Sequence, residues 1–304
     1  MTVFLFPGQG SQRKGITNLQ GSYQITGIAR SVEKEIQRLK AQVDLFWEKE
    51  SKRYIEFGLR DGLSVVELGS GPGFLTEKML ATFPHLKVTA VELDPFLGAY
   101  AKDYLSPKNH VSQKYIHRCE ILQGSLLDTG LATNSFDFAI TRLVLEHLPD
   151  PIGAVQEVLR IVKPRGKAVF VDNDFTTHMI THPHIAELGE LYHAYCQSRE
   201  AEGGNPKIGR ELPTLLKNAG FSKVNFEVIC AHSEIVGDEL FLASEGIGIP
   251  SKLVQDGFLS SKVLAKIAVE WRNMLKSANH SILRQLYMAS GEKPLQRGRA
   301  EREK

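Results

Sequence analysis

The chain has 304 residues, of which 42% are hydrophobic and 24% are charged, with 37 basic and 35 acidic side chains. These values are ordinary for a folded globular protein, and the near balance of charge provides no dense basic stripe for nucleic acid. The three cysteines form no Cys-x-x-Cys pair, and no apolar run approaches the roughly 20 residues that cross a bilayer. We therefore expect a cytoplasmic protein without a metal site, bound neither to nucleic acid nor to a membrane.

The first half of the chain predicts a helix followed by alternating strands and helices. Apolar residues recur at helical spacing from 31 to 57, which predicts a long amphipathic helix that could break near Ser51. Predicted strands follow at Ser64–Leu68, Lys87–Leu93, Glu120–Gln123, Phe136–Thr141 and Lys167–Asp172. Predicted helices separate them near Phe74–Phe83, Pro95–Leu105 and Ile152–Val162. This alternation is typical of a parallel sheet built from βαβ units.

The second half predicts two more strands and a set of added helices. The strands are Val224–Ile229 and Ile282–Met288, and the roughly 50 residues between them are too many for a bare loop, so we read them as a helical lid. We therefore expect an α/β fold of the Rossmann-like type, with a seven-stranded, mostly parallel sheet flanked by helices. Its predicted domains are a leader (1–30), a main domain (31–293) with a helical cap (31–57) and lid insertions (about 178–207 and 232–281), and a flexible tail (294–304).

A glycine-rich turn follows the first strand of the predicted sheet. Glu67 precedes Gly69, Gly71 and Gly73 in the spacing E-x-G-x-G-x-G, and the chain then enters a helix. Glycines there let the backbone approach a ligand closely, and the amides of the helix start face outward as donors. A dinucleotide site would need its third glycine at Phe74, so the spacing instead favours a ligand with an ammonium group and no pyrophosphate. A tight turn without a ligand is the alternative.

An acidic residue ends the second predicted strand at the distance from the glycines where a ribose carboxylate is expected. Glu92 is our candidate to hold both ribose hydroxyls, because the strand ends at about this residue. Asp94 precedes Pro95 and is better placed to cap the next helix.

From about 58 to 170 the motif order resembles that of class I S-adenosylmethionine (SAM) dependent methyltransferases, most closely a subgroup with quinone-biosynthesis and natural-product enzymes. The segments that carry the likeness, beyond the glycine turn, are Ile121–Leu126, Asn134–Phe138, Leu145–Pro151 and Lys163–Lys167. Ser125 stands where the family usually has an acid near the adenine. The resemblance implies SAM as cofactor, bound by Glu67, Gly69, Ser70, Gly71, Gly73, Glu92, Leu93, Ser125, Leu126, Thr141 and Arg142. It also implies that the first long helix folds over the cofactor, with Tyr23, Arg38 or Gln42 touching it.

The opening run Phe4–Gln12 resembles the first strand and turn of malonyl-CoA:acyl-carrier-protein acyltransferases. The chain has no Gly-His-Ser-x-Gly elbow, so the serine that acyl transfer requires is missing. We interpret the run as a relic or a borrowed leader that indicates a polyketide or fatty-acid-like assembly line. A chance similarity is the alternative.

Methyl transfer to a hydroxyl would benefit from a general base, and a histidine has a suitable pKa. We select His147, after the fourth strand, and His178, after the fifth, as candidate bases, although each could equally be structural. The expected function is methylation of an oxygen on a polyketide-like small molecule, free or bound to an acyl carrier protein. The alternatives are methylation of a quinone or polyketide carbon and a non-catalytic SAM-binding scaffold of a synthase complex. A homodimer is a further expectation.

Overall fold

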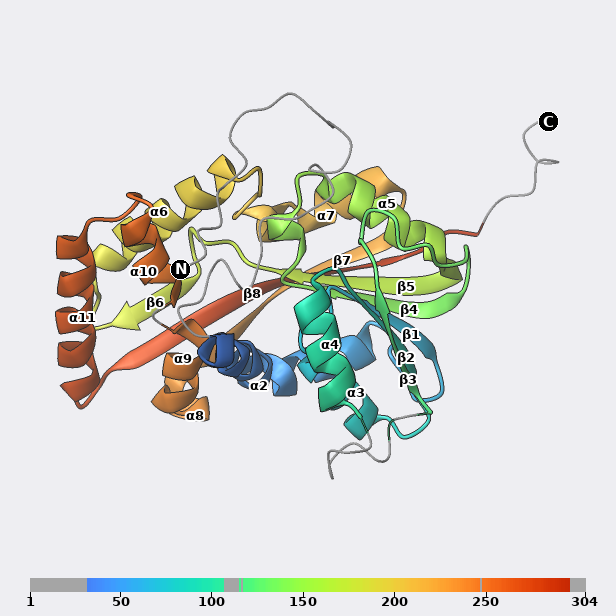
Figure 1. Ribbon diagram of the computed structural model, residues 1–304, viewed down its shortest axis with the longest axis horizontal. Coiled ribbons are helices and arrows are strands. Elements are labelled where there is room, and N and C mark those ends of the chain that lie inside the picture. The colour runs from blue at the N-terminus through green and yellow to red at the C-terminus, as the bar shows by residue number, and fades with distance from the viewer. Residues whose placement is uncertain (1–31, 107–114, 116, 247, 296–304) are drawn as a thin grey trace, which may run out of the picture.

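A computed structural model describes residues 32–106, 115, 117–246 and 248–295, so the predicted leader, Tyr23 and most of the predicted tail lie outside the described residues. One twisted sheet crosses the whole molecule (Figure 1). Its strands are β1 (Ser64–Leu68), β2 (Lys87–Glu92), β3 (Cys119–Gln123), β4 (Phe136–Arg142), β5 (Val162–Asp172), β6 (Met179–His182), β7 (Ser222–His232) and β8 (Ser281–Glu292). The helices are α2 (Val32–Glu56), α3 (Phe74–Thr82), α4 (Pro95–Tyr104), the 3-10 turn η2 (Leu145–His147), α5 (Pro151–Ile161), α6 (Glu187–Ala201), α7 (Ile208–Ala219), α8 (Ser233–Val236), α9 (Asp238–Glu245), α10 (Gly248–Gln255) and α11 (Ser261–Lys276).

Strands β1 to β5 form the parallel part of the sheet, in the spatial order β3-β2-β1-β4-β5. Strand β8 runs antiparallel beside β5, and β7 pairs antiparallel with β8. The mixed α/β sheet flanked by helices is thus confirmed. Strand β5 begins at Val162 and not at the predicted Lys167, because residues 163–166 continue the strand, with a shift in its pairing to β4.

The sheet has eight strands, one more than the sequence predicted. The additional strand, β6, pairs antiparallel with the N-terminal end of β8, from Met179 opposite Arg284 to His182 opposite Ser281. It lies within the segment that we expected to be a lid insertion. Strand β6 has only four residues, and its partner is far along the chain, so no local pattern of hydrophobic residues indicates it.

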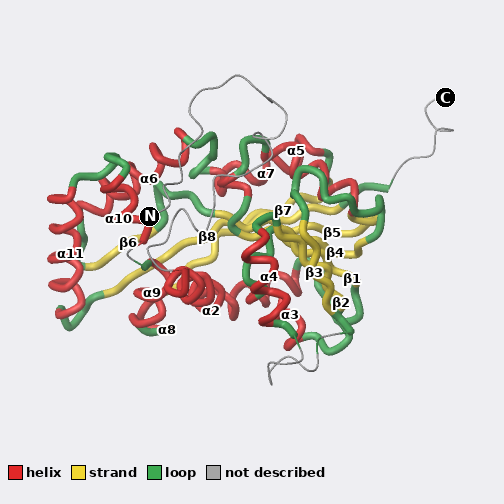
Figure 2. The backbone as a smooth tube through the Cα atoms, viewed as in Figure 1, coloured by secondary structure: helices red, strands yellow, loops and turns green. Residues whose placement is uncertain are grey.

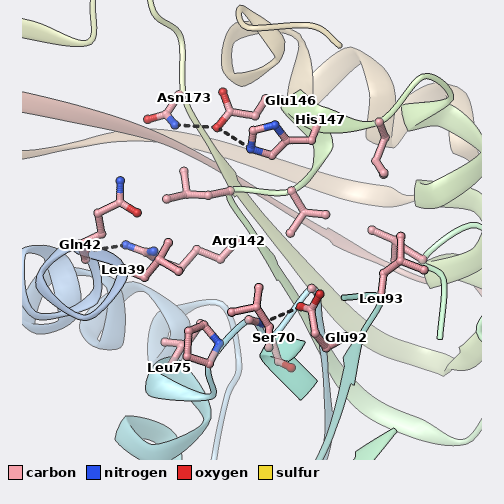
Figure 3. Close-up of a pocket in the computed structure, with 18 of the residues that line it drawn as sticks. Leu39, Gln42, Ser70, Leu75, Glu92, Leu93, Arg142, Glu146, His147 and Asn173 are labelled. Carbon is pink, nitrogen blue, oxygen red and sulfur yellow. Dashed lines mark hydrogen bonds and ion pairs between the residues drawn. The ribbon is translucent and has the colours of Figure 1, made fainter. Parts of the chain in front are cut away.

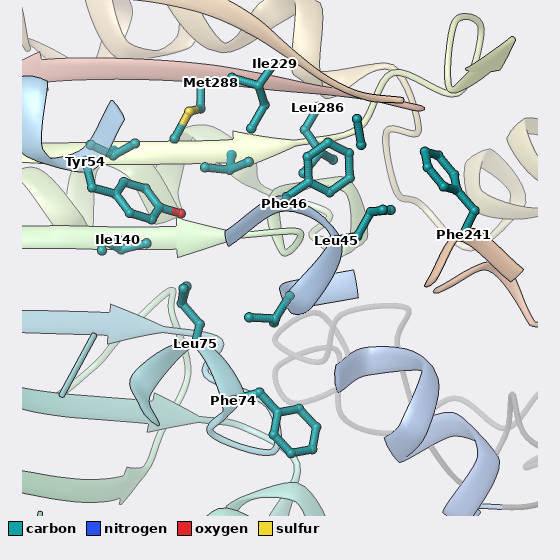
Figure 4. Close-up of a cluster of buried hydrophobic side chains, with 14 of the residues drawn as sticks. Leu45, Phe46, Tyr54, Phe74, Leu75, Ile140, Ile229, Phe241, Leu286 and Met288 are labelled. Carbon is teal, nitrogen blue, oxygen red and sulfur yellow. The ribbon is translucent and has the colours of Figure 1, made fainter. Parts of the chain in front are cut away.

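Helix α2 is continuous from Val32 to Glu56, without a break at Ser51. Its buried face includes Phe46 and Tyr54, which are both fully buried. Figure 4 shows these two rings pointing toward the sheet, where Ile140 of β4 and Met288 of β8 lie. The helix is therefore anchored over the carboxyl ends of the central strands.

Two hydrophobic cores lie on opposite faces of the sheet (Figure 2). On one face, Val66 and Leu68 of β1 pack with α5 and α7. On the other face, α2, α3 and α4 pack against residues such as Val65 and Ile140. This alternation along β1 is what a central strand covered on both sides requires.

Helices α6, α10 and α11 gather at the far end of β8, away from the parallel strands (Figure 1). We call these three helices the outer helical cluster. Helix α11 lies within the segment that the sequence predicted to be helical, and the Ser260 hydroxyl accepts a hydrogen bond from the Val263 N–H (3.2 Å) as its cap. Within the described ranges, no helix is long and apolar enough to span a membrane.

Candidate functional site

The glycine turn joins β1 to α3 at the carboxyl edge of the parallel strands. The N–H groups of Gly69 (2.8 Å) and Ser70 (3.1 Å) donate to the Val91 carbonyl, so the turn is fixed to β2. Gly71 has φ +54°, and a Cβ built there would meet nothing within 4 Å. The turn therefore presents bare backbone to open space, and a larger residue at Gly71 would fill that space.

A cavity of about 220 Å³ lies along this edge of the sheet. The glycine turn, the ends of β2 and β4 and the loop after β3 form one side of it, and α2 and the loop after β5 form the other. Open α/β sheets bind ligands at the carboxyl ends of their parallel strands. The cavity is therefore in the place where the fold predicts a binding site.

Glu92 ends β2 at the wall of this cavity, next to the turn. Its Oε2 accepts a hydrogen bond from the Gly71 N–H (2.7 Å), and its Oε1 accepts one from the Asp94 N–H (2.8 Å). Burial raises the pKa of Glu92, and these backbone hydrogen bonds oppose the rise. Asp94 caps α4 by accepting from the N–H groups of Phe96 and Leu97, as predicted.

Glu67 lies deeper, at the base of the turn. Burial raises the pKa of Glu67 to about 8, although the hydroxyl of Thr76 donates to its carboxylate. Arg142, at the end of β4, forms an ion pair with the buried Glu50 (2.9 Å) and donates to the Gln42 carbonyl (2.9 Å). These contacts tie α2 to the cavity wall.

A second polar group faces the glycine turn from the opposite side of the cavity (Figure 3). Glu146 Oε1 accepts from the Asn173 side-chain amide (3.1 Å) and lies 3.5 Å from His147 Nε2. Burial raises the pKa of the Glu146 carboxyl to about 7, and the hydrogen bond from Asn173 opposes the rise. Glu146 Oε2 and Asn173 Oδ1 are buried without a hydrogen-bond partner in the described part of the chain.

The two histidines chosen from the sequence occupy different surroundings. His147 lines the cavity, and burial together with Arg199 and Arg38 lowers its pKa to about 3, so it is neutral at physiological pH. His178 is stacked on Phe175, with ring centroids 4.4 Å apart, and its Nε2 lies 3.4 Å from Glu245 Oε2. Phe175 lines the cavity, but His178 is not among the described residues that do so.

The structure brings most of the predicted cofactor residues to one cavity. Those that line it are Glu67, Gly69, Ser70, Gly71, Glu92, Leu93, Ser125, Leu126, Arg142 and Gln42, together with Arg38. Gly73 and Thr141 are outside its wall. A Cβ at Gly73 would lie 3.1 Å from Leu105, so this glycine permits close packing of α3 on α4. Thr141 is buried within β4.

Sequence reasoning missed several residues of the opposite wall, above all Glu146 and Asn173. Asp172 and Asp174 flank Asn173 at the end of β5, yet of these three only Asn173 lines the cavity. Asp172 instead accepts from the Glu146 N–H (3.3 Å), and Asp174 pairs with Arg210. The position of Glu146 just after β4 is a sequence signal that could have drawn attention to it, because ligands bind beyond strand ends.

The fold and the cavity together define the class. The features of a class I SAM-dependent methyltransferase domain are all present. They are a parallel sheet in the order β3-β2-β1-β4-β5, an antiparallel β8, a glycine turn after β1 and an acid at the end of β2. Residues 66–170 match the sequence model of the methyltransferase domain family. The chain thus carries a SAM-dependent methyltransferase domain, and SAM is its cofactor.

Curated relatives support this assignment at low identity. An uncharacterized methyltransferase of Schizosaccharomyces pombe is 28% identical over 148 residues, covering 49% of this chain and 52% of that protein. A malonyl-[acyl-carrier protein] O-methyltransferase of Paenibacillus is 23% identical over 160 residues, covering 53% of this chain and 55% of that protein. The chain thus spans about half the length of the curated relatives that it matches.

A solved structure of phosphoethanolamine N-methyltransferase 2 from Haemonchus contortus, in complex with SAM, has the same fold. It superposes with a TM-score of 0.53 at 18% identity, covering 84% of this chain and 56% of that one. At this identity the likeness concerns the fold.

Proposed function

We propose that the protein transfers the methyl group of SAM to an oxygen of a small-molecule acceptor. The observation that carries the proposal is the cavity in which the bare glycine turn and Glu92 face a second polar group, Glu146 with Asn173. One wall has the chemistry to hold a nucleoside, and the other has a carboxyl group able to exchange a proton near neutral pH.

The residues of the turn fit the cofactor. The space beside Gly71 accepts a ligand where any Cβ would intrude, and the buried Ser70 hydroxyl has no hydrogen-bond partner among the described residues. We assign Glu92 to the ribose hydroxyls, Leu93, Ser125 and Leu126 to the surroundings of the adenine, and Glu67 to the ammonium end. An ammonium group beside Glu67 would favour its charged form and so offset the cost of burying it.

Bound SAM supplies an electrophilic methyl group on a sulfonium. The residues of the opposite wall then position the acceptor hydroxyl and remove its proton. Glu146 is the better candidate for this step, because its pKa of about 7 lies near the operating pH, whereas His147 is a weak base in this environment. The contact between them makes His147 a group that orients Glu146, and His178 acts further away, by holding Phe175.

Two observations favour an acceptor from an assembly line of the polyketide or fatty-acid type, including one presented by an acyl carrier protein. The opening run Phe4–Gln12 resembles carrier-protein acyltransferases. The Paenibacillus relative bears the name of an O-methyltransferase of a carrier-bound malonyl group.

The test combines a binding measurement with a search for the product. Calorimetry of the full chain with SAM and with S-adenosylhomocysteine should show binding at one site. Incubation with SAM and an extract of the producing cell should then yield a small molecule heavier by one methyl group. Fragmentation of that product distinguishes methylation of oxygen from methylation of a quinone or polyketide carbon.

Three outcomes would contradict the proposal. An absence of SAM binding would remove the assignment of the cavity. Binding without transfer to any acceptor would favour a non-catalytic SAM-binding scaffold. Label from SAM found only in protein or RNA would also reject a small-molecule acceptor.

A further inference from the structure

A second cavity, of about 470 Å³, lies within and beneath the outer helical cluster. Its walls come from α6, α10 and α11, with the end of α9 and the segment before β6 closing it. Hydrocarbon side chains such as Leu188, Leu191, Leu253 and Ile267 supply most of this surface. We call this cavity the chamber. Its volume falls in the range of about 300–1,000 Å³ that is usual for sites of drug-sized ligands.

The chamber adjoins the cavity that contains the glycine turn. Phe175, Tyr195, Ile249 and Leu253 line both cavities and form a neck between them. The rings of Phe175 and Tyr195 lie 4.0 Å apart between centroids, and His178 is stacked on Phe175. A ligand seated in the chamber would therefore direct one end through an aromatic neck toward Glu146 and Asn173.

The charged side chains of the chamber wall already have partners within the protein. Glu245 lies 3.0 Å from Arg284 and 3.4 Å from His178, and mainly the charge of Arg284 lowers its pKa to about 2 despite burial. Arg272 is exposed, and its Nε donates to the Ala268 carbonyl (3.0 Å). Apart from the exposed Arg272, whose guanidinium remains hydrated, the described wall residues offer no unpaired opposite charge to an ionic group of a ligand, and such a group would lose its hydration here.

We propose that the chamber binds the body of the methyl acceptor, and that this body is uncharged and largely hydrocarbon. The proposal rests on the proposed function, because it takes the reacting oxygen to lie at the neck, on the side of Glu146. Small ionic acceptors would leave the chamber without a role. The energy of binding comes from apolar surface that the ligand and the wall remove from water.

The chain provides its own reporter for this test. It has two tryptophans, of which Trp271 on α11 lines the chamber and Trp47 on α2 does not. In a Trp47→Phe background, the uncharged fluorophore 1-aminoanthracene should quench Trp271 by energy transfer and gain emission of its own. The experiment uses the full chain saturated with S-adenosylhomocysteine.

Two substitutions on α11 form a matched pair. Leu264 lines the chamber, whereas Val269 is 45% exposed on the same helix and is not among the wall residues. Leu264→Asp should weaken binding of 1-aminoanthracene by about tenfold or more, because it places an unpaired charge in an apolar wall. Val269→Asp should leave the affinity unchanged. Equal affinities in the two variants would overturn the proposal.

Competition against 1-aminoanthracene then tests the class of ligand. 1-Naphthol should displace the fluorophore, and 1-naphthoate and choline should do so about tenfold less well or not at all, since each carries a charge that must be desolvated. Displacement by the charged compounds as effective as that by 1-naphthol would overturn the proposal. Calorimetry with S-adenosylhomocysteine, run separately on each variant, reports on the cofactor site alone. Loss of fluorophore selectivity with intact S-adenosylhomocysteine binding would refute the chamber, whereas loss of S-adenosylhomocysteine binding in the wild type would refute the proposed function.

Discussion

The two cavities of this molecule are built by opposite means. The one at the strand ends uses the bare backbone of the glycine turn and three buried carboxyl groups at or just beyond the ends of parallel strands, Glu67, Glu92 and Glu146. The chamber uses hydrocarbon side chains of helices and pairs its charged groups within the protein. The cavity at the strand ends therefore offers specific polar contacts suited to one particular ligand. The chamber offers volume and apolar surface, whose shape changes when its side chains are substituted.

The largest expected effect comes from the polar wall of the first cavity that faces the glycine turn. Glu146→Gln should lower kcat by about 10²–10⁴-fold, because the amide cannot accept the acceptor proton. Wild-type kcat should rise with pH and level off above about 7, since the raised pKa keeps Glu146 protonated below that value. The measurement is a pH profile of methyl transfer at saturating SAM.

Glu157→Gln is the control for this variant. Glu157 is also a shielded carboxylate, but it bonds Arg160 and Thr129 on the far side of α5. The Glu157→Gln variant should retain the wild-type pH profile of methyl transfer. If Glu146→Gln kept both the rate and the profile, the base would lie elsewhere, and His147→Gln would become the variant to measure.

Two glycines of the same turn separate folding from binding. Gly69→Ala should lower the free energy of unfolding by about 2–5 kcal/mol, because φ is positive and the new Cβ would lie 2.3 Å from the Val144 side chain. Gly71→Ala should lower the free energy of unfolding by only about 1–2 kcal/mol, because its new Cβ meets no neighbour and only the positive φ is unfavourable. It should nevertheless weaken SAM binding. Urea unfolding and calorimetry measure the two effects. Equal stability losses would show that the space beside Gly71 is not open.

The sequence predicted the strand-end cavity far better than the chamber, and the reason is physical. Gly71, Glu92 and Ser125 reach one edge because each lies at or just after the end of a strand of a parallel sheet, and strand patterns are local. The chamber wall joins α6 to α10 and α11, whose packing depends on long-range contacts and on the short strand β6. Likewise, Asn173 lines the cavity and the equally buried Asp172 does not, and no local sequence pattern distinguishes the two.

A smaller effect is expected at Glu92, the proposed partner of the ribose. Glu92→Gln should weaken SAM binding by about 10–100-fold, the equivalent of one hydrogen bond to a charged group. Asp94→Asn should preserve the affinity, because asparagine also caps a helix well. Neither variant should change the binding of 1-aminoanthracene. A loss of fluorophore binding in Glu92→Gln would mean that the two cavities do not act separately.

The last effect concerns the pH dependence of stability at Glu67. Its pKa is raised from 4.5 to about 8 in the folded state, so between these values the folded chain holds a proton that the unfolded chain releases. The free energy of unfolding therefore falls as pH rises through this window, by at most about 1.4 kcal/mol per pH unit from this group. Glu67→Gln removes this contribution, and urea unfolding without ligand at pH 5 to 8 should show a smaller decline.

The exposed Glu48→Gln serves as the control for that slope. Because Lys52 lowers the pKa of Glu48, the Glu48 carboxylate favours the folded chain as pH rises. Its replacement by glutamine therefore cannot make the decline in the free energy of unfolding smaller. Saturating S-adenosylhomocysteine should shrink the difference between wild type and Glu67→Gln, since an ammonium group nearby favours the carboxylate. If S-adenosylhomocysteine left the difference between wild type and Glu67→Gln unchanged, the ammonium group of the cofactor would lie away from Glu67. The polar contacts of the cofactor would then be limited to the glycine turn and Glu92.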